Sequence, residues 1–252
     1  AIAGDKIVRI GSAPPGFVPD RVLEGRDRIV LPGLINTHTH LSMTLMRNYA
    51  DDLAFWPWLL ERIKPLEDHL VPEDVRIGAR LGIAELIRGG TTCFHDMYFH
   101  LDEVADEVAS AGLRARLCGA LFDNSGRGEH LLRAAVELHD HWHGKASGRV
   151  TVALAPHSAY LCSPPYLKEI LHEARRLQCG LHIHVAETER EVSDSRERYG
   201  VTPVQHLAEL GCFRVPTLAA HGIYVDAADC RLLRERRVSI ADHPGSNLQL
   251  RI

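Results

Sequence analysis

The sequence predicts an α/β fold in which a parallel sheet is either doubly wound or closed into a barrel. Short apolar runs alternate with longer amphipathic stretches from residue 33 onward, and this alternation is typical of parallel strands connected by helices. Glycine follows most of the amphipathic stretches, as expected at helix ends. The chain has 252 residues, a length that suits a single barrel domain.

The expected strands are short runs rich in apolar and β-branched residues. They are Leu34–Thr37, Thr91–Phe94, Arg114–Gly119, Val150–Ala155, Leu181–Val185, Thr217–Ala220 and Val238–Ala241. The expected helices carry apolar residues at helical spacing. They are Glu73–Arg88, Leu101–Ala111, Glu129–Trp142, Pro165–Leu177, Pro203–Leu210 and Ala227–Arg237. Residues 1–32 differ from the rest, because the β-branched runs Lys6–Ile10 and Arg28–Leu31 flank a turn-rich segment and indicate a small β element.

The composition excludes several classes of protein. Hydrophobic residues make up 45% and charged residues 25% of the chain, which is ordinary for a globular protein. A formal net charge of −4 offers no basic surface for nucleic acid or for an anionic membrane. No apolar run reaches the roughly 18 residues of a membrane span, and the first residues lack a signal-peptide pattern. The six cysteines lie far apart without a C-x-x-C pair, which indicates reduced thiols. We therefore expect a cytoplasmic protein that binds neither nucleic acid nor membranes.

Histidine is frequent, at 16 residues, and several histidines fall at the ends of predicted strands. Barrels of this class carry their chemistry at the carboxyl ends of the strands. His38 and His40 follow the first strand, and residues two apart on an extended segment point the same way. His184 lies near the end of the fifth strand, and His221 follows the sixth. Imidazoles from separate strands can hold a metal ion and leave positions open on it, as a catalytic site requires.

Two further features allow both a structural and a functional interpretation. His139, His141 and His143 could form a histidine-rich metal tract, but the helical spacing of their apolar neighbours favours a solvated helix face. Glu187 could be a solvated residue at the start of a helix, where it would interact with the helix dipole. It could also move protons beside a metal-bound water. We favour the proton-transfer role because Glu187 follows His184 so closely.

Six motifs in chain order resemble the amidohydrolase superfamily. They are PGLINTHTHLSMTLMRNYADDLAFWPWL, TTCFHDMYFH, APHSAYLCS, HIHVAETERE, AAHGIYVD and SNLQL, and together they cover nearly the whole chain. Within the superfamily the chain is most similar to deaminases of 5′-methylthioadenosine and S-adenosylhomocysteine, which are related to triazine chlorohydrolases and guanine deaminases. The resemblance implies a TIM-type (β/α)8 amidohydrolase barrel at residues 33–252, with residues 1–32 as part of a small β-sandwich.

The resemblance also implies a reaction and a metal site. The reaction is the metal-dependent hydrolytic deamination of an adenine nucleoside, in which hydroxide formed on one divalent ion attacks the amino-bearing ring carbon. His38, His40 and His184 match the metal ligands. These ligands suit Zn²⁺, while Fe²⁺ and Mn²⁺ are also compatible with them. Glu187 matches the glutamate that protonates the purine ring nitrogen, and His221 matches a histidine that orients or polarises beside the metal.

Substrate contacts follow from the same resemblance. His157 matches a histidine that contacts the nucleoside, and Asp51 falls where the deaminases carry a glutamate that holds the ribose hydroxyls. Arg127 is either a substrate-side arginine or a solvated loop charge. Gly119 stands where some relatives carry an arginine for the substrate's tail, and Asp242-His243-Pro244 replaces the family's H-N-P. These differences leave the exact substrate open.

The superfamily closes its barrel with an eighth strand, whose terminal aspartate ligates the metal and takes a proton from the attacking water. The sequence predicts seven strands, and seven cannot close an eight-stranded barrel without unpaired edges. We therefore expect residues 1–252 to be part of a longer natural chain.

Several alternatives stay open at this point. The same site could dechlorinate or deaminate a triazine or guanine-like ring. If the chain ended at residue 252, it could be an inactive metal-binding barrel. A structural α/β domain with incidental histidines fits the strand-end placement poorly. The expected partner is a small molecule, and homo-oligomerisation is left open.

Overall fold

The computed structural model describes residues 1–4 and 6–250. The chain divides into two compact units, Ala1–Pro32 and Gly33–Ile252. Each unit is described separately. None of the helices among the described residues has the length and apolar character needed to cross a membrane.

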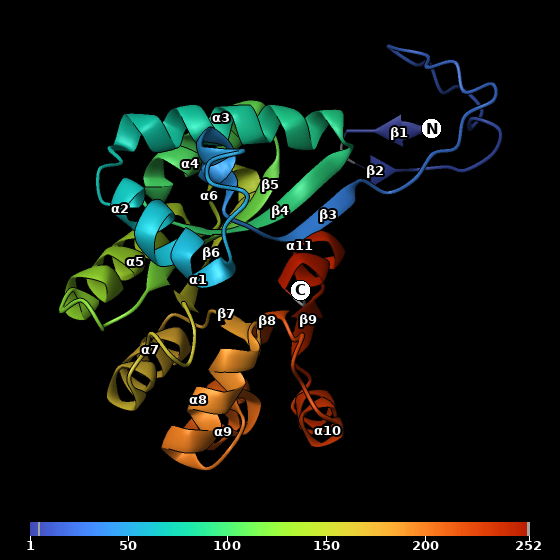
Figure 1. Cartoon of the computed structure of the whole chain (residues 1–252). Coiled ribbons are helices and arrows are strands. Elements are labelled where there is room, and N and C mark those ends of the chain that lie inside the picture. Colours follow the sequence, from blue (N-terminus) through green and yellow to red (C-terminus); the bar gives the residue numbers. More distant parts are fainter. Residues whose placement is uncertain (5, 251–252) are drawn as a thin grey trace. The chain divides into compact units, whose positions relative to one another are not determined.

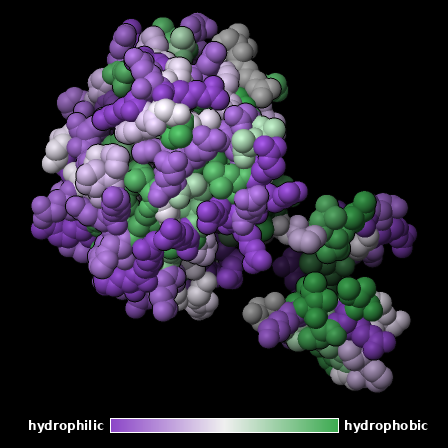
Figure 2. Space-filling model, turned by 90° about the horizontal axis from the view of Figure 1, so that it is seen from below, coloured by the Kyte–Doolittle hydropathy of each residue, from purple (hydrophilic) through white to green (hydrophobic). Residues whose placement is uncertain are grey.

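The first unit contains one small antiparallel sheet. Its strands are β1 (Ile2–Ala3) and β2 (Lys6–Ile7), and Ile2 lies opposite Ile7. The prediction of a strand at Arg28–Leu31 is wrong, because Val30 is 90% exposed and this run pairs with no strand among the described residues. β-Branched residues favour a strand only where a partner and a packed face are present. Apolar side chains are therefore exposed on this unit (Figure 2).

The second unit is a parallel sheet of seven strands, curved into a nearly closed barrel (Figure 1). The strands are β3 (Leu34–Thr39), β4 (Thr91–Tyr98), β5 (Arg114–Leu121), β6 (Val150–Pro156), β7 (Leu181–Val185), β8 (Thr217–His221) and β9 (Ser239–Ala241). Each strand pairs with its neighbours in sequence order, so β3 and β9 are the two ends of the sheet. The predicted TIM-type fold class is confirmed, with seven strands of the barrel in the described residues.

Helices connect the strands, and most of them lie around the outside of this barrel (Figure 1). The main ones are α3 (Pro72–Arg88), α4 (Leu101–Ala111), α5 (Gly128–Trp142), α7 (Pro164–Arg176), α8 (Glu189–Tyr199), α9 (Pro203–Leu210), α10 (Ala227–Glu235) and α11 (Pro244–Leu250). Shorter ones are η1 (Leu41–Met46), α1 (Phe55–Pro57), η2 (Trp58–Ile63), α2 (Lys64–Glu67), α6 (Lys145–Gly148) and η3 (Cys212–Arg214). Every helix expected from the sequence is present to within two residues at each end. Helix α8 was not among the helices predicted from apolar spacing, because its buried residues include only one large apolar side chain, Val192.

The core has an outer and an inner layer. Between sheet and helices, large side chains such as Leu154, Ile170 and Ile183 are fully buried. On the strands themselves a separate cluster consists mostly of small residues, including Cys118 and Ala153. Because residues two apart on a strand share a face, this alternation assigns large side chains to one face and small ones to the other. Small side chains leave the room that the mouth of the barrel needs for imidazole rings.

Candidate active site

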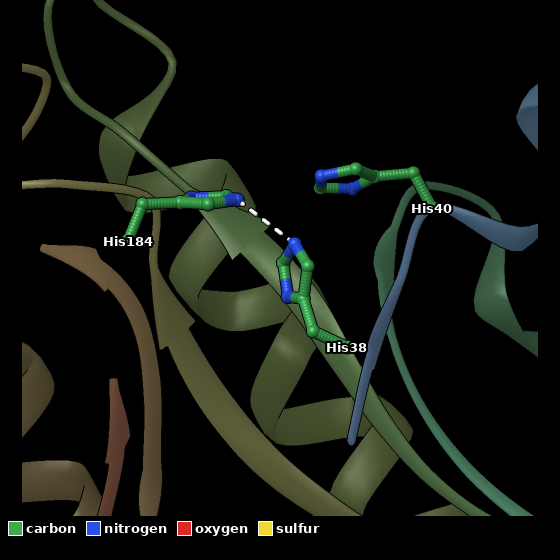
Figure 3. Close-up of side chains that lie close together, drawn as sticks. All are labelled: His38, His40 and His184. Carbon is green, nitrogen blue, oxygen red and sulfur yellow. Dashed lines mark hydrogen bonds between the residues drawn. The ribbon is translucent and has the colours of Figure 1, made fainter. Parts of the chain in front are cut away.

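Three imidazoles meet at the carboxyl ends of β3 and β7. His38 lies near the end of β3, His40 directly follows that strand, and His184 lies on β7. One ring nitrogen of each lies within 4.8 Å of the others, and the three rings face a common point (Figure 3). The pairing of β3 with β4 shifts register between Asn36 and Thr39. Such irregularities re-aim side chains next to active sites, and this one lies at His38.

The hydrogen bonds of these rings leave lone pairs for a cation. His40 Nδ1 lies 2.6 Å from the carbonyl oxygen of Met97, and His184 Nδ1 lies 2.8 Å from that of His157. A carbonyl only accepts, so each Nδ1 carries the proton and each Nε2 has a free lone pair. His184 Nε2 lies 3.2 Å from His38 Nε2 (Figure 3). When His38 also carries its proton on Nδ1, its Nε2 lone pair faces that of His184 and a cation between them relieves the repulsion, so the donor set fits a divalent metal ion.

Burial keeps these ligands neutral. Desolvation is the main cause that lowers the pKa of His38 and of His184 well below the ordinary value, and neighbouring imidazoles lower both further. Desolvation also lowers the pKa of His40. Neutral imidazole is the form that binds metals. Three such ligands leave coordination positions open for water or substrate.

Two turns with left-handed backbone place Glu187 and His221 at the mouth of the barrel. Ala186, just after β7, has φ of 50°, and His221, at the end of β8, has φ of 76°. Left-handed backbone is costly for residues other than glycine and clusters at functional sites. The turn at Ala186 is held by the carboxylate of Glu191, which accepts the backbone N–H groups of Ala186 at 3.1 Å and Glu187 at 2.9 Å.

Glu187 and His221 face each other across this mouth. Glu187 Oε1 lies 3.4 Å from His221 Nε2, and both residues are buried. The other ring nitrogen of His221, Nδ1, donates to Asn247 Oδ1 at 3.1 Å. Asn247 in turn donates to Asp242 at 2.7 Å. This chain of hydrogen bonds directs the lone pair of His221 Nε2 into the site.

The Glu187 carboxyl group is set up as a proton donor. Burial, and then the nearby carboxylate of Glu191, raise the pKa of Glu187 to about 8. A carboxylic acid with this pKa carries its proton at neutral pH and can give it to a substrate atom. The arrangement can therefore combine a metal ion with a buried acid.

A cavity of about 1660 Å³ opens over these residues. Its lining includes His157, Asp51 and Arg127, so the structure brings all three predicted substrate contacts to the cavity. His157 is the most buried of the three, and its ring centroid lies 4.6 Å from that of His184. Asp51 is exposed, and Arg127 is an exposed residue that pairs with Asp68 at 3.6 Å.

Several residues of the site were not identified from the sequence. Glu67, at the end of α2, lines the cavity, is half-buried, and has its pKa raised by burial to about 6. His182 lies under the three imidazoles, and its spacing from His184 repeats the H-x-H pattern of His38 and His40, a signal that could have identified it. His243 forms a second potential metal-binding group with His38 and His221. Nothing in the local sequence around Glu67 distinguishes it from a solvated helix residue.

The histidine-rich tract lies on α5, away from these groups. His141 and His143 are exposed, and His139 is half-buried. None of the three belongs to a potential three-ligand metal group among residues 1–4 and 6–250. The rings of His139 and His143 lie 4.5 Å apart between centroids, and His143 Nδ1 accepts the backbone N–H of Val152 at 3.2 Å.

Comparisons with known proteins give a consistent result. Residues 29–252 match the amidohydrolase family. The 5-methylthioadenosine/S-adenosylhomocysteine deaminase of Caldanaerobacter subterraneus subsp. tengcongensis is 46% identical over 251 residues, which are 99% of this chain and 58% of the relative. The chain thus spans little more than half the length of that relative.

Two solved structures share the barrel. A zinc-bound adenosine deaminase from Xanthomonas campestris superposes with a TM-score of 0.81 at 36% identity, over 87% of this chain and 51% of that one. The zinc complex of atrazine chlorohydrolase from Arthrobacter aurescens superposes with a TM-score of 0.78 at 22% identity, over 87% of this chain and 55% of that one. The second likeness shows a shared fold only.

Proposed function

This chain belongs to the amidohydrolase family, and we propose that it forms the metal-binding part of a hydrolytic deaminase of adenine nucleosides such as 5′-methylthioadenosine or S-adenosylhomocysteine. One observation carries the proposal: the buried carboxyl group of Glu187 lines the same cavity as three converging imidazoles. Identity of 46% to a protein named for this activity supports the substrate class. The likeness to the atrazine chlorohydrolase, at 22% identity, supports the fold alone.

His38, His40 and His184 would hold one divalent ion. Zinc is the expected metal, since imidazole suits it and the similar adenosine deaminase structure contains it. Iron or manganese would be compatible with the same ligands. When bound, the ion would lower the pKa of a coordinated water to about 7 and so supply hydroxide at neutral pH.

Glu187 would act as the general acid. Deamination at the amino-bearing carbon places negative charge on the adjacent ring nitrogen, and a proton delivered there stabilises the transition state. The raised pKa keeps Glu187 protonated before the reaction begins. His221, held by Asn247, would orient the acid and the incoming water through its inward-facing Nε2.

The cavity walls would select a nucleoside. We propose that His157 contacts the bound purine nucleoside, because its ring lies next to that of His184 at the cavity floor. A carboxylate would hold the ribose hydroxyls. Asp51 was expected in this role, and Glu67 is the more buried carboxylate on the same cavity. Arg127, placed over the ring of Phe122, would stand at the substrate's tail.

The same proposal covers location and partners. Six free cysteines, four of them buried, are consistent with a reducing compartment, and we propose a cytoplasmic enzyme. The formal net charge of −4 favours a small-molecule partner over nucleic acid or an anionic membrane.

A steady-state ammonia-release assay tests the proposal. The full-length, zinc-loaded protein is given purine nucleosides, guanine and triazines in parallel, and kcat/KM is compared. We expect the adenine nucleosides to give the highest value. For chlorotriazines the reaction is followed by chloride release. A higher kcat/KM for guanine or for a chlorotriazine would show that this compound, and not an adenine nucleoside, is the substrate. No turnover of any member would contradict the assignment as a hydrolase.

A further inference from the structure

A fourth histidine, His182, lies directly beneath the three imidazoles. It is on β7, two residues before His184, so both side chains point to the same face of the sheet. His182 is 1% exposed. Its Nε2 atom lies 2.8 Å from His38 Nδ1, which makes it the hydrogen-bond partner of that ring.

The three candidate ligands are held in two different ways. His40 and His184 each point Nδ1 at a backbone carbonyl, which can only accept a proton. Their tautomer is therefore fixed by the main chain. His38 points Nδ1 at a side chain instead, and an imidazole nitrogen can either donate or accept.

The proton between His38 and His182 decides what His38 offers to a metal. If His182 Nε2 donates, the neutral His38 carries its proton on Nε2, and that proton points at His184 Nε2, 3.2 Å away. If His182 Nε2 accepts, His38 Nε2 has a free lone pair. Only the second arrangement gives three ligands to one ion.

Nothing else in the described part of the chain fixes the tautomer of His182. Its Nδ1 atom is buried and has no hydrogen-bond partner among residues 1–4 and 6–250. The ring can therefore place its proton on Nδ1 and leave Nε2 as an acceptor. Partners of this kind, bonded to the far nitrogen of a ligating histidine, orient the ring and increase its basicity.

We propose that His182 is a positioning residue for the metal site, and that its Nε2 accepts the Nδ1 proton of His38 and so keeps His38 Nε2 free and aimed at the ion. The inference rests on the proposed metal site and goes one step beyond it. His182 would touch neither ion nor substrate. It would act through the ring of His38 alone.

Zinc affinity of the full-length protein tests this, measured by competition with a chromophoric chelator. His182→Leu removes the acceptor at similar volume and is expected to raise the zinc Kd by about 10- to 100-fold. In His182→Gln the side-chain oxygen can reach the place of Nε2, so its Kd should stay within about threefold of wild type. His182→Asn carries its oxygen at the place of Nδ1 and should lose zinc as His182→Leu does.

A matched control is His95→Leu. His95 lies on β4, with its ring centroid 6.0 Å from that of His182, and its Nδ1 is likewise buried without a partner in the described residues. Its side chain bonds to no candidate ligand there, so its substitution should leave the zinc Kd within about threefold of wild type. The visible spectrum of the cobalt-substituted protein gives a second readout, since a reoriented His38 ring changes the ligand field in His182→Leu and not in His95→Leu.

The outcomes distinguish a failure of the proposed metal site from a failure of the proposed role of His182. Absence of zinc binding by the wild-type protein would contradict the metal site itself. Wild-type zinc binding with unchanged affinity and cobalt spectrum in His182→Leu would contradict the role of His182. If His182→Leu does not fold, the comparison of His182→Gln with His182→Asn decides, and equal zinc affinity of these two would overturn the inference.

Discussion

Glu187 Oε1 lies 3.4 Å from Nε2 of His221, in a part of the barrel mouth where both side chains are buried. Burial lowers the pKa of His221 to about 4, so the ring is neutral, and because its Nδ1 donates to Asn247 its Nε2 accepts. The proton between the two groups therefore belongs to Glu187, in agreement with the pKa that burial raises to about 8. This relationship makes Glu187 a neutral acid in the resting site.

Substitution of Glu187 by glutamine should separate proton transfer from metal binding. Glu187→Gln keeps the shape of the side chain and removes the transferable proton, so kcat should fall by about 100- to 10,000-fold. The zinc content should stay unchanged, because Glu187 is not among the three converging imidazoles. Ammonia release and metal content are measured on the same preparation. Glu189→Gln, two residues further along and exposed, is the control and should keep full activity.

Substitution of His184 by alanine should remove the metal. His184 is the most buried of the three candidate ligands, and with His38 and His40 alone too few imidazoles remain to hold an ion tightly. We expect less than stoichiometric zinc after dialysis and no turnover. His141→Ala, an exposed histidine on α5, should retain both. Full zinc retention in His184→Ala would show that other residues form the site.

Two carboxylates on the cavity can be compared directly as ribose ligands. Glu67→Gln should raise KM for the nucleoside by about 10- to 100-fold, because a buried charged hydrogen bond contributes about 1.5–3 kcal/mol. Asp51→Asn should have a smaller effect, because Asp51 is exposed and better solvated. Neither variant should change KM for the free base, which lacks the ribose. An increase in KM for the nucleoside in Asp51→Asn alone would show that Asp51, and not Glu67, holds the ribose hydroxyls.

In the metal-free protein the buried histidines should lower the unfolding free energy in acid, whereas buried carboxyl groups with a raised pKa, such as that of Glu187, act in the opposite direction. Burial is the main cause that lowers the pKa of His157 to about 3 and of His221 to about 4, from 6.5. The unfolded chain therefore takes up protons that the folded chain does not. Their contribution to the unfolding free energy is fully present above pH 6.5 and declines as the pH falls towards about 3, by up to about 1.4 kcal/mol per pH unit for each histidine.

Urea unfolding of zinc-free protein at a series of pH values measures this dependence. His157→Gln has one buried imidazole fewer, so its unfolding free energy should increase relative to that of wild type as the pH falls below about 6.5. A difference between the two proteins that stays constant from about pH 6.5 to 5 would contradict the buried, neutral state of this ring.

Most of the barrel could be predicted from the sequence, because the spacing of apolar residues within each segment indicates a strand or a helix. Strand β7 was located to the residue, and helices α4 and α9 had the predicted ends. Helix α8 was missed because it packs through polar groups such as Glu191, which hold the turn at Ala186 instead of supplying an apolar stripe. The strand expected at Arg28–Leu31 failed for the opposite reason, since its residues have the propensity but no partner strand in the described part of the chain.

The part of the candidate site that could be predicted consists of histidines at regular positions near strand ends. His38, His40 and His184 stand at strand ends in a pattern that the sequence displays. Glu67 and Asn247 could not be identified in this way, because their roles depend on helices folding back over the mouth of the barrel. His182 was visible in the sequence but has a function only through its contact with His38, 144 residues away.

The most direct test of the central claim is the fate of the amino group of 5′-methylthioadenosine in isotopically labelled water. The full-length, zinc-loaded protein should release one ammonia for each nucleoside and place one labelled oxygen on the ring carbon that carried the amino group. Glu187→Gln should do neither at a comparable rate. Intact nucleoside after prolonged incubation with zinc-loaded enzyme, or label found elsewhere in the product, would contradict the proposed deaminase.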